Sequence, residues 1–275
     1  MKLESVAGKK VLVTGAAMGL GKLFAERAVR EGAAAVVLWD VNEIALKAAA
    51  AELSGRGTAV HQHVVDVADQ AAVAAAAAVV RAEAGDIDIL VNNAGIVRGN
   101  SYFWETENRA DIDKTMAINA LAPMYVTLEF LPAMVRGTGT ARVLTIASSA
   151  GLVANPRMSV YAASKWAALG WSDSVRLELE QAGHDHVKVT TVCPTYINTG
   201  MFDGAKGFWF TPILDQDEVV DTSWREMKQG NPLVILPWTS RLNKALSGIL
   251  PIKLRDVFLS TVGVYNSMEK FTGRK

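Results

Sequence analysis

The chain has 275 residues, of which half are hydrophobic and 20% are charged. This composition excludes an intrinsically disordered chain and supplies enough apolar side chains for a substantial core. The 28 Lys and Arg residues balance the 28 Asp and Glu residues, so no net field favours nucleic acid or an anionic membrane. We therefore expect a compact globular protein whose partner is a small molecule.

Cysteine and histidine usage bears on metal sites and on the compartment. Cys193 has no second cysteine to pair with, which favours a reducing compartment. The histidines (His61, His63, His184 and His186) show no zinc-like spacing, so we expect structural or surface roles and predict no metal. No signal-peptide core and no apolar run of about 18 residues is evident. The sequence therefore predicts a soluble cytoplasmic protein.

Short β-branched runs alternate with segments of helical composition along the first 200 residues. We expect strands at 11–14, 35–39, 60–65, 87–92, 143–147 and 187–192. Nearly continuous apolar strands separated by helices are typical of a parallel sheet covered on both faces. The alanine-rich residues 68–84 are expected to form one of these helices. Residues 1–275 are thus predicted to form a single α/β domain, a doubly wound parallel sheet of the Rossmann type in three α/β/α layers.

After about Thr199 the pattern changes and no further strand is evident. Residues 201–275 are predicted to form a substrate lid and a C-terminal helical region. One apolar stripe recurs every four residues, at Leu242, Leu246, Leu250, Leu254 and Phe258. We expect it to pack on the core or on a neighbouring subunit. Peripheral membrane contact stays open, because Arg241, Lys244, Lys253 and Arg255 are accompanied only by Asp256 between residues 241 and 256.

The first expected strand runs into the turn Thr14-Gly15-Ala16-Ala17-Met18-Gly19-Leu20-Gly21, and a helix is expected to begin near Lys22. Glycines permit a tight turn, close approach of a pyrophosphate and close packing of the helix on the strand. The helix N-terminus offers N–H groups to the anion. We predict a dinucleotide site formed by Gly15, Met18, Gly19, Leu20 and Gly21. A plain structural turn and an S-adenosylmethionine site are the alternatives.

Asp40 ends the second expected strand, 19 residues beyond Gly21. An acidic residue at this point can accept hydrogen bonds from the adenosine ribose hydroxyls, which favours NAD. A 2′-phosphate about 4 Å from its carboxylate would be repelled by about 1 to 4 kcal/mol. Met18, and not an arginine, occupies the glycine-rich turn. Alternatively, Asp40 is the N-cap of the following helix.

Tyr161 and Lys165 are four residues apart, which on a helix places them on one face. A tyrosine with its ordinary pKa near 10 is a poor proton shuttle at neutral pH. An ammonium about 5 Å away contributes roughly 3 kcal/mol, or about two pKa units. We therefore expect Lys165 to lower the pKa of Tyr161. Ser148, at the end of the 143–147 strand, is expected to polarise a substrate carbonyl, with Ser149 as the alternative.

The turn at 14–21, Asn92-Asn93-Ala94-Gly95, Asn119, Ser148 and Tyr161-Ala162-Ala163-Ser164-Lys165 resemble the classical short-chain dehydrogenase/reductase family. The resemblance spans residues 8 to about 200. It implies a catalytic tetrad of Asn119, Ser148, Tyr161 and Lys165, in which Asn119 holds a relay water and Lys165 also contacts the nicotinamide ribose. It implies a dimer or a tetramer as well.

The same resemblance implies further contacts with the cofactor. Tyr161 is expected to supply one of them. Asp66 and Val67 are assigned to the adenine ring, although a loop-capping role for Asp66 is an alternative. Asn93, Ala94 and Gly95 are assigned to the cofactor site, where Asn92 and Asn93 are expected mainly to brace the sheet beside the adenine pocket. Pro194, Ile197 and Thr199 are assigned to the nicotinamide carboxamide, and Thr195 departs from the family's usual glycine.

Substrate choice is expected to come from residues 96–104 and 201–213, which follow strands at the carboxyl edge. Aromatic side chains there are predicted to line a hydrophobic cavity: Phe103, Trp104, Phe202, Phe208, Trp209 and Phe210. Segments 233–241, 250–251 and 271–274 resemble retinol and 17-beta-hydroxysteroid dehydrogenases more loosely. We predict reversible hydride transfer between NAD(H) and a lipophilic alcohol and its ketone or aldehyde. An NADP-preferring carbonyl reductase and a non-redox dinucleotide-sensing or epimerase-like protein are the alternatives.

Overall fold

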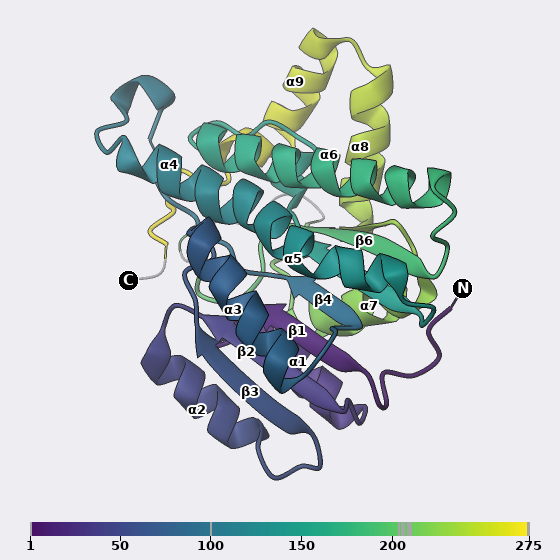
Figure 1. Ribbon diagram of the computed structural model, residues 1–275. Coiled ribbons are helices and arrows are strands. Elements are labelled where there is room, and N and C mark those ends of the chain that lie inside the picture. Colours follow the sequence, from purple (N-terminus) through teal and green to yellow (C-terminus); the bar gives the residue numbers. More distant parts are fainter. Residues whose placement is uncertain (1, 100, 203, 205–206, 208–210, 274–275) are drawn as a thin grey trace.

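The computed structural model describes residues 2–99, 101–202, 204, 207 and 211–273. They contain a seven-stranded parallel sheet in the order β3-β2-β1-β4-β5-β6-β7, with helices on both faces (Figure 1). The strands are β1 (Lys10–Thr14), β2 (Ala35–Asp40), β3 (Ala59–Val64), β4 (Ile89–Asn92), β5 (Ala141–Ile146), β6 (Val187–Pro194) and β7 (Leu233–Leu236). The predicted doubly wound α/β fold is confirmed.

Helices connect successive strands and cover both faces of the sheet. They are α1 (Gly19–Arg30), α2 (Glu43–Leu53), α3 (Gln70–Glu83), α4 (Ala110–Met116), α5 (Ala122–Arg136), α6 (Ser159–Gln181), α7 (Gln216–Gln229), α8 (Trp238–Ile249) and α9 (Ile252–Thr261). The alanine-rich segment is α3, which begins after Asp69, whose carboxylate accepts hydrogen bonds from Ala71 and Ala72 N–H.

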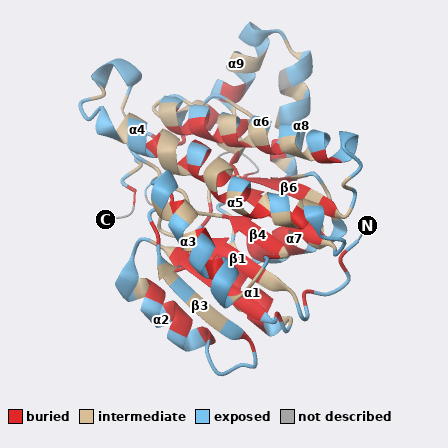
Figure 2. Cartoon of the chain, in the orientation of Figure 1, coloured by how far each residue is buried: buried red, intermediate tan, exposed pale blue. Residues whose placement is uncertain are grey.

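Alternate residues of each central strand enter two separate cores. Val11 and Val13 pack in the core formed with α1 and α7, whereas Leu12 packs with α3 and α5 on the other face. The side-chain period of two in a strand produces this division. Figure 2 shows the consequence, with buried residues along the sheet and exposed residues on the outer faces of the helices.

The strand β7 corrects the expectation that no strand follows Thr199. It pairs with β6 from Thr191 opposite Leu233 to Pro194 opposite Leu236. Four consecutive apolar residues carry no periodicity that separates a strand from a helix, which is why sequence reasoning missed it. A single bridge between Ile197 and Leu214 then holds the two ends of the segment that follows β6 close together.

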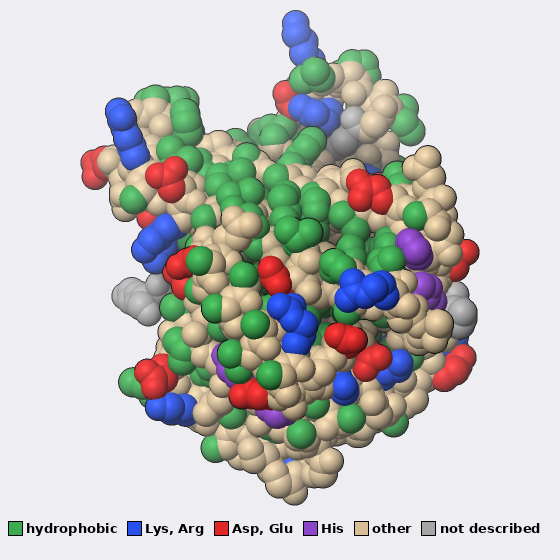
Figure 3. Space-filling model, in the orientation of Figure 1, with side chains coloured by type: hydrophobic (Ala, Val, Ile, Leu, Met, Phe, Trp, Pro, Cys, Tyr) green, Lys and Arg blue, Asp and Glu red, His purple; other side chains and the backbone are tan. Residues whose placement is uncertain are grey.

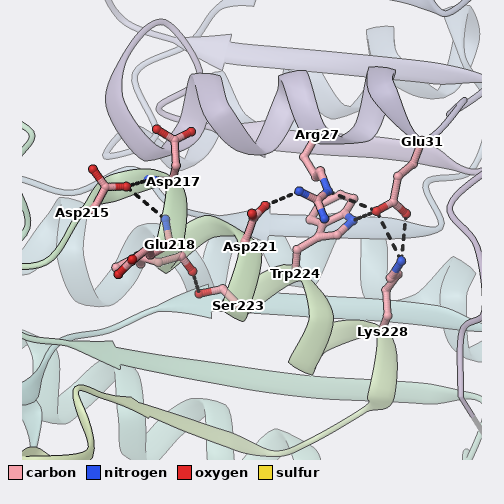
Figure 4. A network of polar contacts seen from close by, with 10 residues as sticks. Arg27, Glu31, Asp215, Asp217, Glu218, Asp221, Ser223, Trp224 and Lys228 are labelled. Atoms are coloured by element: carbon pink, nitrogen blue, oxygen red, sulfur yellow. Dashed lines mark hydrogen bonds and ion pairs between the residues drawn. The ribbon is translucent and has the colours of Figure 1, made fainter.

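A network of charged groups fastens α7 to the end of α1 (Figure 4). The Glu31 carboxylate accepts hydrogen bonds from Trp224 Nε1 at 3.0 Å, Lys228 Nζ at 3.0 Å and Arg27 Nε at 3.2 Å. Burial raises the pKa of Glu31, but the hydrogen bonds from Lys228 and Arg27 outweigh it and hold this pKa below its usual value. Arg27 also pairs with Asp221 on α7.

One continuous helical stretch, Ala110–Arg136, joins α4 to α5 through a π-helical segment at Ala117–Leu121. Among the described residues it is the helix long and apolar enough to cross a membrane by length and composition, and 44% of its most apolar window is buried. The sequence expectation of no such apolar stretch missed it. The helix packs against α3 and α6, as a core helix of an α/β domain does.

The apolar stripe of the C-terminal region is divided between two helices. α8 ends at Ile249 and α9 begins at Ile252, because Pro251 lacks an N–H and disfavours helical backbone at Leu250. The two helices project from the body of the domain (Figure 1). Leu242 is 50% exposed and Leu254 is 60% exposed, so the expected packing of this stripe on the core is wrong.

Candidate active site

A cleft of about 580 Å³ lies at the carboxyl ends of the central strands. Most of the residues that the sequence singled out line it: Gly15, Met18, Gly19, Leu20, Asp40, Asp66, Val67, Asn93, Ala94, Gly95, Ser148, Tyr161, Lys165, Pro194, Ile197 and Thr199. Gly21 and Asn119 are not among its lining residues. Open α/β sheets bind ligands at this edge.

The glycine-rich turn has the shape of a phosphate cradle. A Cβ on Gly21 would lie 2.0 Å from the Gly15 carbonyl oxygen, so α1 can approach β1 only with glycine here. At Gly19 the φ angle is +55° and a Cβ would meet nothing closer than Thr199, at 3.9 Å, across the cleft. The first turn of α1 begins at Gly19 and carries no acidic residue. This end of the cleft therefore fits a dinucleotide pyrophosphate.

Asn93 braces this turn from the neighbouring strand. Its Nδ2 donates to the carbonyl oxygens of Thr14 and Gly15 at 3.0 and 3.1 Å. The N–H groups of Asn93 and Ala94 both donate to Thr14 Oγ1. The structure thus gives Asn93 the bracing role that the resemblance implied, and Asn92 braces α5 through Thr127 Oγ1.

Asp40 lies in the cleft at the end of β2, beside the glycine-rich turn. Its Oδ2 accepts from Ala17 N at 3.0 Å and its Oδ1 from Asn42 N at 2.9 Å. Asn42 is the N-cap of α2, so the alternative that Asp40 caps this helix is wrong. A carboxylate has about four acceptor positions, which leaves capacity for ribose hydroxyls. Asp66 accepts from Ala68 N, as the loop-capping alternative expects, and it also lines the cleft, where its contact with an adenine ring stays a prediction.

Tyr161 is 4% exposed and points into the cleft from the first turn of α6. Burial raises the pKa of the Tyr161 phenol above its usual value, and a hydrogen bond with the Ser148 side chain opposes this shift. The expectation that Lys165 lowers this pKa is therefore wrong for the protein groups alone, because desolvation of the phenolate is the larger effect. The raised pKa favours the protonated phenol at neutral pH.

Ser148, and not Ser149, is the hydroxyl beside Tyr161. It caps the short 3₁₀ helix Ser149–Gly151, accepting from Ala150 N at 3.2 Å, and its Oγ lies 3.5 Å from the Pro194 carbonyl oxygen. Ser148 lines both the cleft and the adjoining smaller pocket, whereas Ser149 lines only the latter. Its position between the two cavities suits a group that binds the reacting oxygen.

Lys165 is buried one turn beyond Tyr161. Its Nζ donates to the Ile146 carbonyl oxygen at 3.0 Å and lies 5.8 Å from the centre of the Tyr161 ring. Burial lowers the pKa of Lys165 to about 8. Its two other N–H donors are available for hydroxyl groups of a ligand in the cleft.

Asn119 is 1% exposed and sits in the π-helical segment between α4 and α5. Its side chain exchanges two 2.8 Å hydrogen bonds with the backbone of Ile96, and its Nδ2 also donates to Ser164 Oγ. A Cβ on Gly95 would lie 3.3 Å from Asn119 Oδ1 and 3.5 Å from Lys165 Nζ, so the tetrad residues converge. The Asn119 side chain therefore positions the segment after β4 against α6.

The smaller pocket, of about 50 Å³, adjoins Tyr161 and Ser148 on the side away from the glycine-rich turn. Its apolar wall is formed by Leu152, Val153, Met158, Phe202 and Val264. Two polar atoms in its lining residues, Thr195 Oγ1 and Asn155 Oδ1, are buried without a hydrogen-bond partner among the described residues. The pocket thus combines an apolar wall with two buried polar atoms that have capacity for a hydrogen bond.

Two predicted wall residues lie elsewhere. Phe103 and Trp104 are 60% and 80% exposed and line neither cavity described above, so their prediction is wrong. They belong to a short 3₁₀ helix that turns outward. The Trp104 ring stacks on the Tyr102 ring with 4.8 Å between their centres, and the Arg157 guanidinium lies 4.5 Å from the centre of the Tyr102 ring. Phe202 does line the site, and the predicted residues Phe208, Trp209 and Phe210 lie outside the described residues.

Sequence reasoning missed the walls supplied by distant segments. Ser240 and Asn243 of α8 and Val264 reach the smaller pocket, and Met268, which is fully buried, packs on Tyr161. The sequence predicted a substrate lid over residues 201–275, but no local signal singles out these residues, since only the tertiary fold brings them to Tyr161. Among the described residues, no group of three or more His, Cys, Asp or Glu side chains could hold a metal ion.

A parallel sheet with a glycine-rich turn after β1 and a Tyr161–Lys165 pair at its carboxyl edge defines a Rossmann-type oxidoreductase. The family model described as short chain dehydrogenase matches residues 9–206. The chain belongs to the short-chain dehydrogenase family.

The looser likeness of the C-terminal segments is confirmed by curated relatives. Estradiol 17-beta-dehydrogenase 11 of Homo sapiens is 34% identical over 261 residues, covering 95% of this chain and 85% of that protein. Epidermal retinol dehydrogenase 2 of Mus musculus is 36% identical over 275 residues, covering 99% and 88% respectively.

Solved structures show the same fold with either cofactor. A short-chain dehydrogenase/reductase of Burkholderia phymatum in complex with NAD has a TM-score of 0.79 and 25% identity, covering 89% of this chain and 96% of that chain. A short-chain dehydrogenase of Sphingobium yanoikuyae in complex with NADPH has a TM-score of 0.74 and 28% identity, covering 92% and 95%. The choice between the two cofactors therefore depends on this chain's own residues.

Proposed function

We propose that this protein catalyses reversible hydride transfer between NAD(H) and a hydrophobic primary or secondary alcohol and its carbonyl partner. The observation that carries the proposal is the position of the Tyr161 phenol and the Ser148 hydroxyl, which line both the dinucleotide-sized cleft and the apolar pocket. A substrate oxygen at this junction meets a proton donor and a second hydroxyl together.

The bound nicotinamide supplies the hydride in reduction and accepts it in oxidation. In reduction, the Tyr161 phenol gives its proton to the substrate oxygen as the carbonyl carbon gains the hydride. Burial keeps this phenol protonated, which suits it to the donor role. Ser148 Oγ hydrogen-bonds the same oxygen and polarises the carbonyl. In oxidation, the alcohol proton would pass to the phenolate form of Tyr161, and the positive charge that an oxidised nicotinamide would bring to the cleft favours this form.

Asp40 supports NAD as the preferred cofactor. Its carboxylate is fixed at the cleft by two backbone N–H groups, so it cannot turn away from a ribose placed there. Among the described residues that line the cleft, the cations are Arg98, which follows β4, and Lys165 on α6. Neither belongs to the β1–α1 turn or to the end of β2, where a 2′-phosphate would need a positive partner.

The smaller pocket supports a lipophilic substrate. One wall consists of apolar side chains, and relatives over 30% identical are named for estradiol and retinol. A preference for hydrophobic alcohols follows, because burying apolar surface contributes about 25 cal/mol per Å².

The direct test is net absorbance change at 340 nm with a panel of aromatic, steroidal, retinoid and short aliphatic alcohols, each offered NAD or NADP. The proposal expects NADH formation with hydrophobic alcohols and much weaker activity with ethanol and with NADP. Cofactor binding without absorbance change for any alcohol or carbonyl would favour a dinucleotide-sensing or epimerase-like protein. Equal use of both cofactors would remove the argument from Asp40.

The surface of α5 and α6 supports a homo-oligomer. Leu128 on α5 is 64% exposed, and Trp166 and Leu177 on α6 are 53% and 52% exposed. Figure 3 shows hydrophobic side chains gathered over these two helices. A flat face of this kind suits a two-fold dimer contact. Light scattering is expected to give the molar mass of a dimer or tetramer. In the Leu128→Glu variant, the measured molar mass is expected to fall because the oligomer dissociates.

A further inference from the structure

The helices α8 and α9 form a projecting hairpin that makes few contacts with the domain (Figure 1). Of the residues between 238 and 261 whose side chains the structure describes, Ser240 and Leu259 are the buried ones. Both helices are therefore held mainly at their base, and the turn between them, which we call the hairpin tip (residues 249–252), lies farthest from it.

The hairpin carries an unusual density of exposed apolar side chains. Large hydrophobic residues there are Trp238 (68% exposed), Leu242 (50%), Ile249 (79%), Ile252 (67%), Leu254 (60%), Val257 (65%) and Phe258 (39%). Single exposed hydrophobic residues are common, but a group within 21 successive residues forms a patch. Burial of such a patch by a partner is favourable, and the tip is its most exposed part.

Positive charge accompanies the apolar patch. Arg241, Lys244, Lys253 and Arg255 lie on the two helices with Asp256, in a chain whose net charge is zero. Arg255 hydrogen-bonds Asp256 at 2.8 Å, which also accepts from the Tyr265 hydroxyl. Lys244 and Lys253 are exposed, and among the described residues no hydrogen bond or ion pair engages either ammonium group. These two ammonium groups are available to an anionic ligand surface.

We propose that the hairpin docks on an anionic lipid bilayer, with the tip entering the boundary between headgroups and acyl chains. A convex apolar tip fits a fluid surface, and flanking lysines can extend their ammonium groups to lipid phosphates while their stems stay in the apolar layer. Self-association through the same hairpin would bring together two segments that each carry more cations than anions, so their net like charge opposes it. The charge pattern therefore favours lipid over a second copy.

The docked hairpin lies next to the substrate side of the active site. Ser240 and Asn243, near the base of α8, line the smaller pocket beside Tyr161. Tyr265, bonded to Asp256 of α9, begins the segment that leads to Met268, which packs on Tyr161. A bilayer bound at the tip would thus be anchored beside the pocket. The proposal goes beyond the oxidoreductase function and does not depend on it.

Flotation of the full chain with vesicles tests this proposal without any substrate. The probes are vesicles of phosphatidylcholine alone and of phosphatidylcholine mixed with phosphatidylserine. The variant Ile249→Asn with Ile252→Asn alters the tip, and Lys244→Gln with Lys253→Gln removes the charges. The matched control is Ile44→Asn with Val79→Asn, since these side chains are 85% and 44% exposed on α2 and α3.

We expect the wild type and the control to float with the anionic vesicles and to bind neutral vesicles more weakly. The tip variant is expected to lose at least tenfold in vesicle affinity, and the lysine variant is expected to bind like wild type at high salt. Failure of wild type to float with anionic vesicles would overturn the proposal, as would flotation of the tip variant at the wild-type level. If the tip variant changes the mass of the oligomer and leaves flotation unchanged, the apolar patch is a contact between copies of the chain and not a lipid-binding surface.

Discussion

The amine of Lys165 lies 5.8 Å from the centre of the Tyr161 ring, one turn further along α6. Both groups are buried, and burial raises the pKa of the tyrosine while it lowers the pKa of the lysine to about 8. Each shift favours the neutral form. The pair is therefore set for proton donation by the phenol and carries an amine that is unusually ready to lose its charge.

Replacement of Lys165 by methionine is expected to stabilise the cofactor-free protein at pH 7 by about 1 to 3 kcal/mol while abolishing turnover. The folded-state pKa is depressed, so the unfolded chain binds more protons between pH 8 and the ordinary value of 10.5. The free energy of unfolding of the wild type therefore rises relative to that of the variant as pH rises through this window. Urea unfolding of both proteins from pH 7 to 10.5 measures the difference between their free energies of unfolding. A difference that does not change with pH would contradict the assigned pKa.

The two adjacent serines provide a matched comparison at the substrate oxygen. Ser148→Ala is expected to reduce kcat by roughly a hundredfold to a thousandfold, because it removes a preorganised hydrogen-bond donor. Ser149→Ala is expected to change kcat by less than about threefold, since its hydroxyl does not line the cofactor cleft. Steady-state kinetics with one alcohol decides between them. A larger loss for Ser149→Ala would reassign the donor.

Cofactor choice is expected to shift when the charge of Asp40 is removed. The wild type is expected to bind NADH over NADPH by roughly tenfold to a thousandfold, from repulsion of about 1 to 4 kcal/mol. In Asp40→Asn the preference for NADH over NADPH is expected to decrease, while the amide oxygen can still accept a hydrogen bond from a backbone N–H. Asp66→Asn removes the same charge elsewhere in the cleft and serves as control. Fluorescence titrations of both reduced cofactors give the ratios, and an unchanged ratio in Asp40→Asn rules out the charge argument.

Two glycines in helices are expected to respond to alanine in opposite ways. Gly21→Ala forces a Cβ to within 2.0 Å of the Gly15 carbonyl oxygen, so it should destabilise the fold and weaken dinucleotide binding at least tenfold. Gly170→Ala in α6 meets nothing within 4 Å and should stabilise the protein by about 0.5 to 1 kcal/mol. Thermal melts with and without NADH compare the two. Normal cofactor binding by Gly21→Ala would mean that α1 can retreat from β1.

Local signals predicted most of the site because it is built from strand ends. The glycine-rich turn, Asp40, Ser148 and Pro194 each follow or end a strand that its β-branched composition reveals, and parallel strands bring these ends to one edge. The helical spacing of Tyr161 and Lys165 placed them correctly on one face. The shift in the tyrosine pKa could not be predicted, because it depends on burial by Met158 and Met268.

Features that depend on distant packing escaped prediction. The strand β7 and the contribution of α8 and Val264 to the smaller pocket arise only once the C-terminal region folds onto β6. Arg142 is another example, since a cation in a central strand is fully buried by carbonyl oxygens of Met227 and Lys228 at the end of α7. Its pKa falls to about 10 through burial. No periodicity in the sequence predicts that these carbonyl groups bind Arg142.

The central claim is that the Tyr161 hydroxyl transfers the substrate proton, and Tyr161→Phe tests it most directly. Phenylalanine retains the ring that packs on Met158, Met268 and Phe202, so fold and cofactor affinity should persist. We expect the rate of hydride transfer, measured in a single turnover at 340 nm, to fall by roughly a hundredfold to ten-thousandfold with NADH binding unchanged. A variant that binds NADH normally and retains most of the wild-type rate would contradict the account.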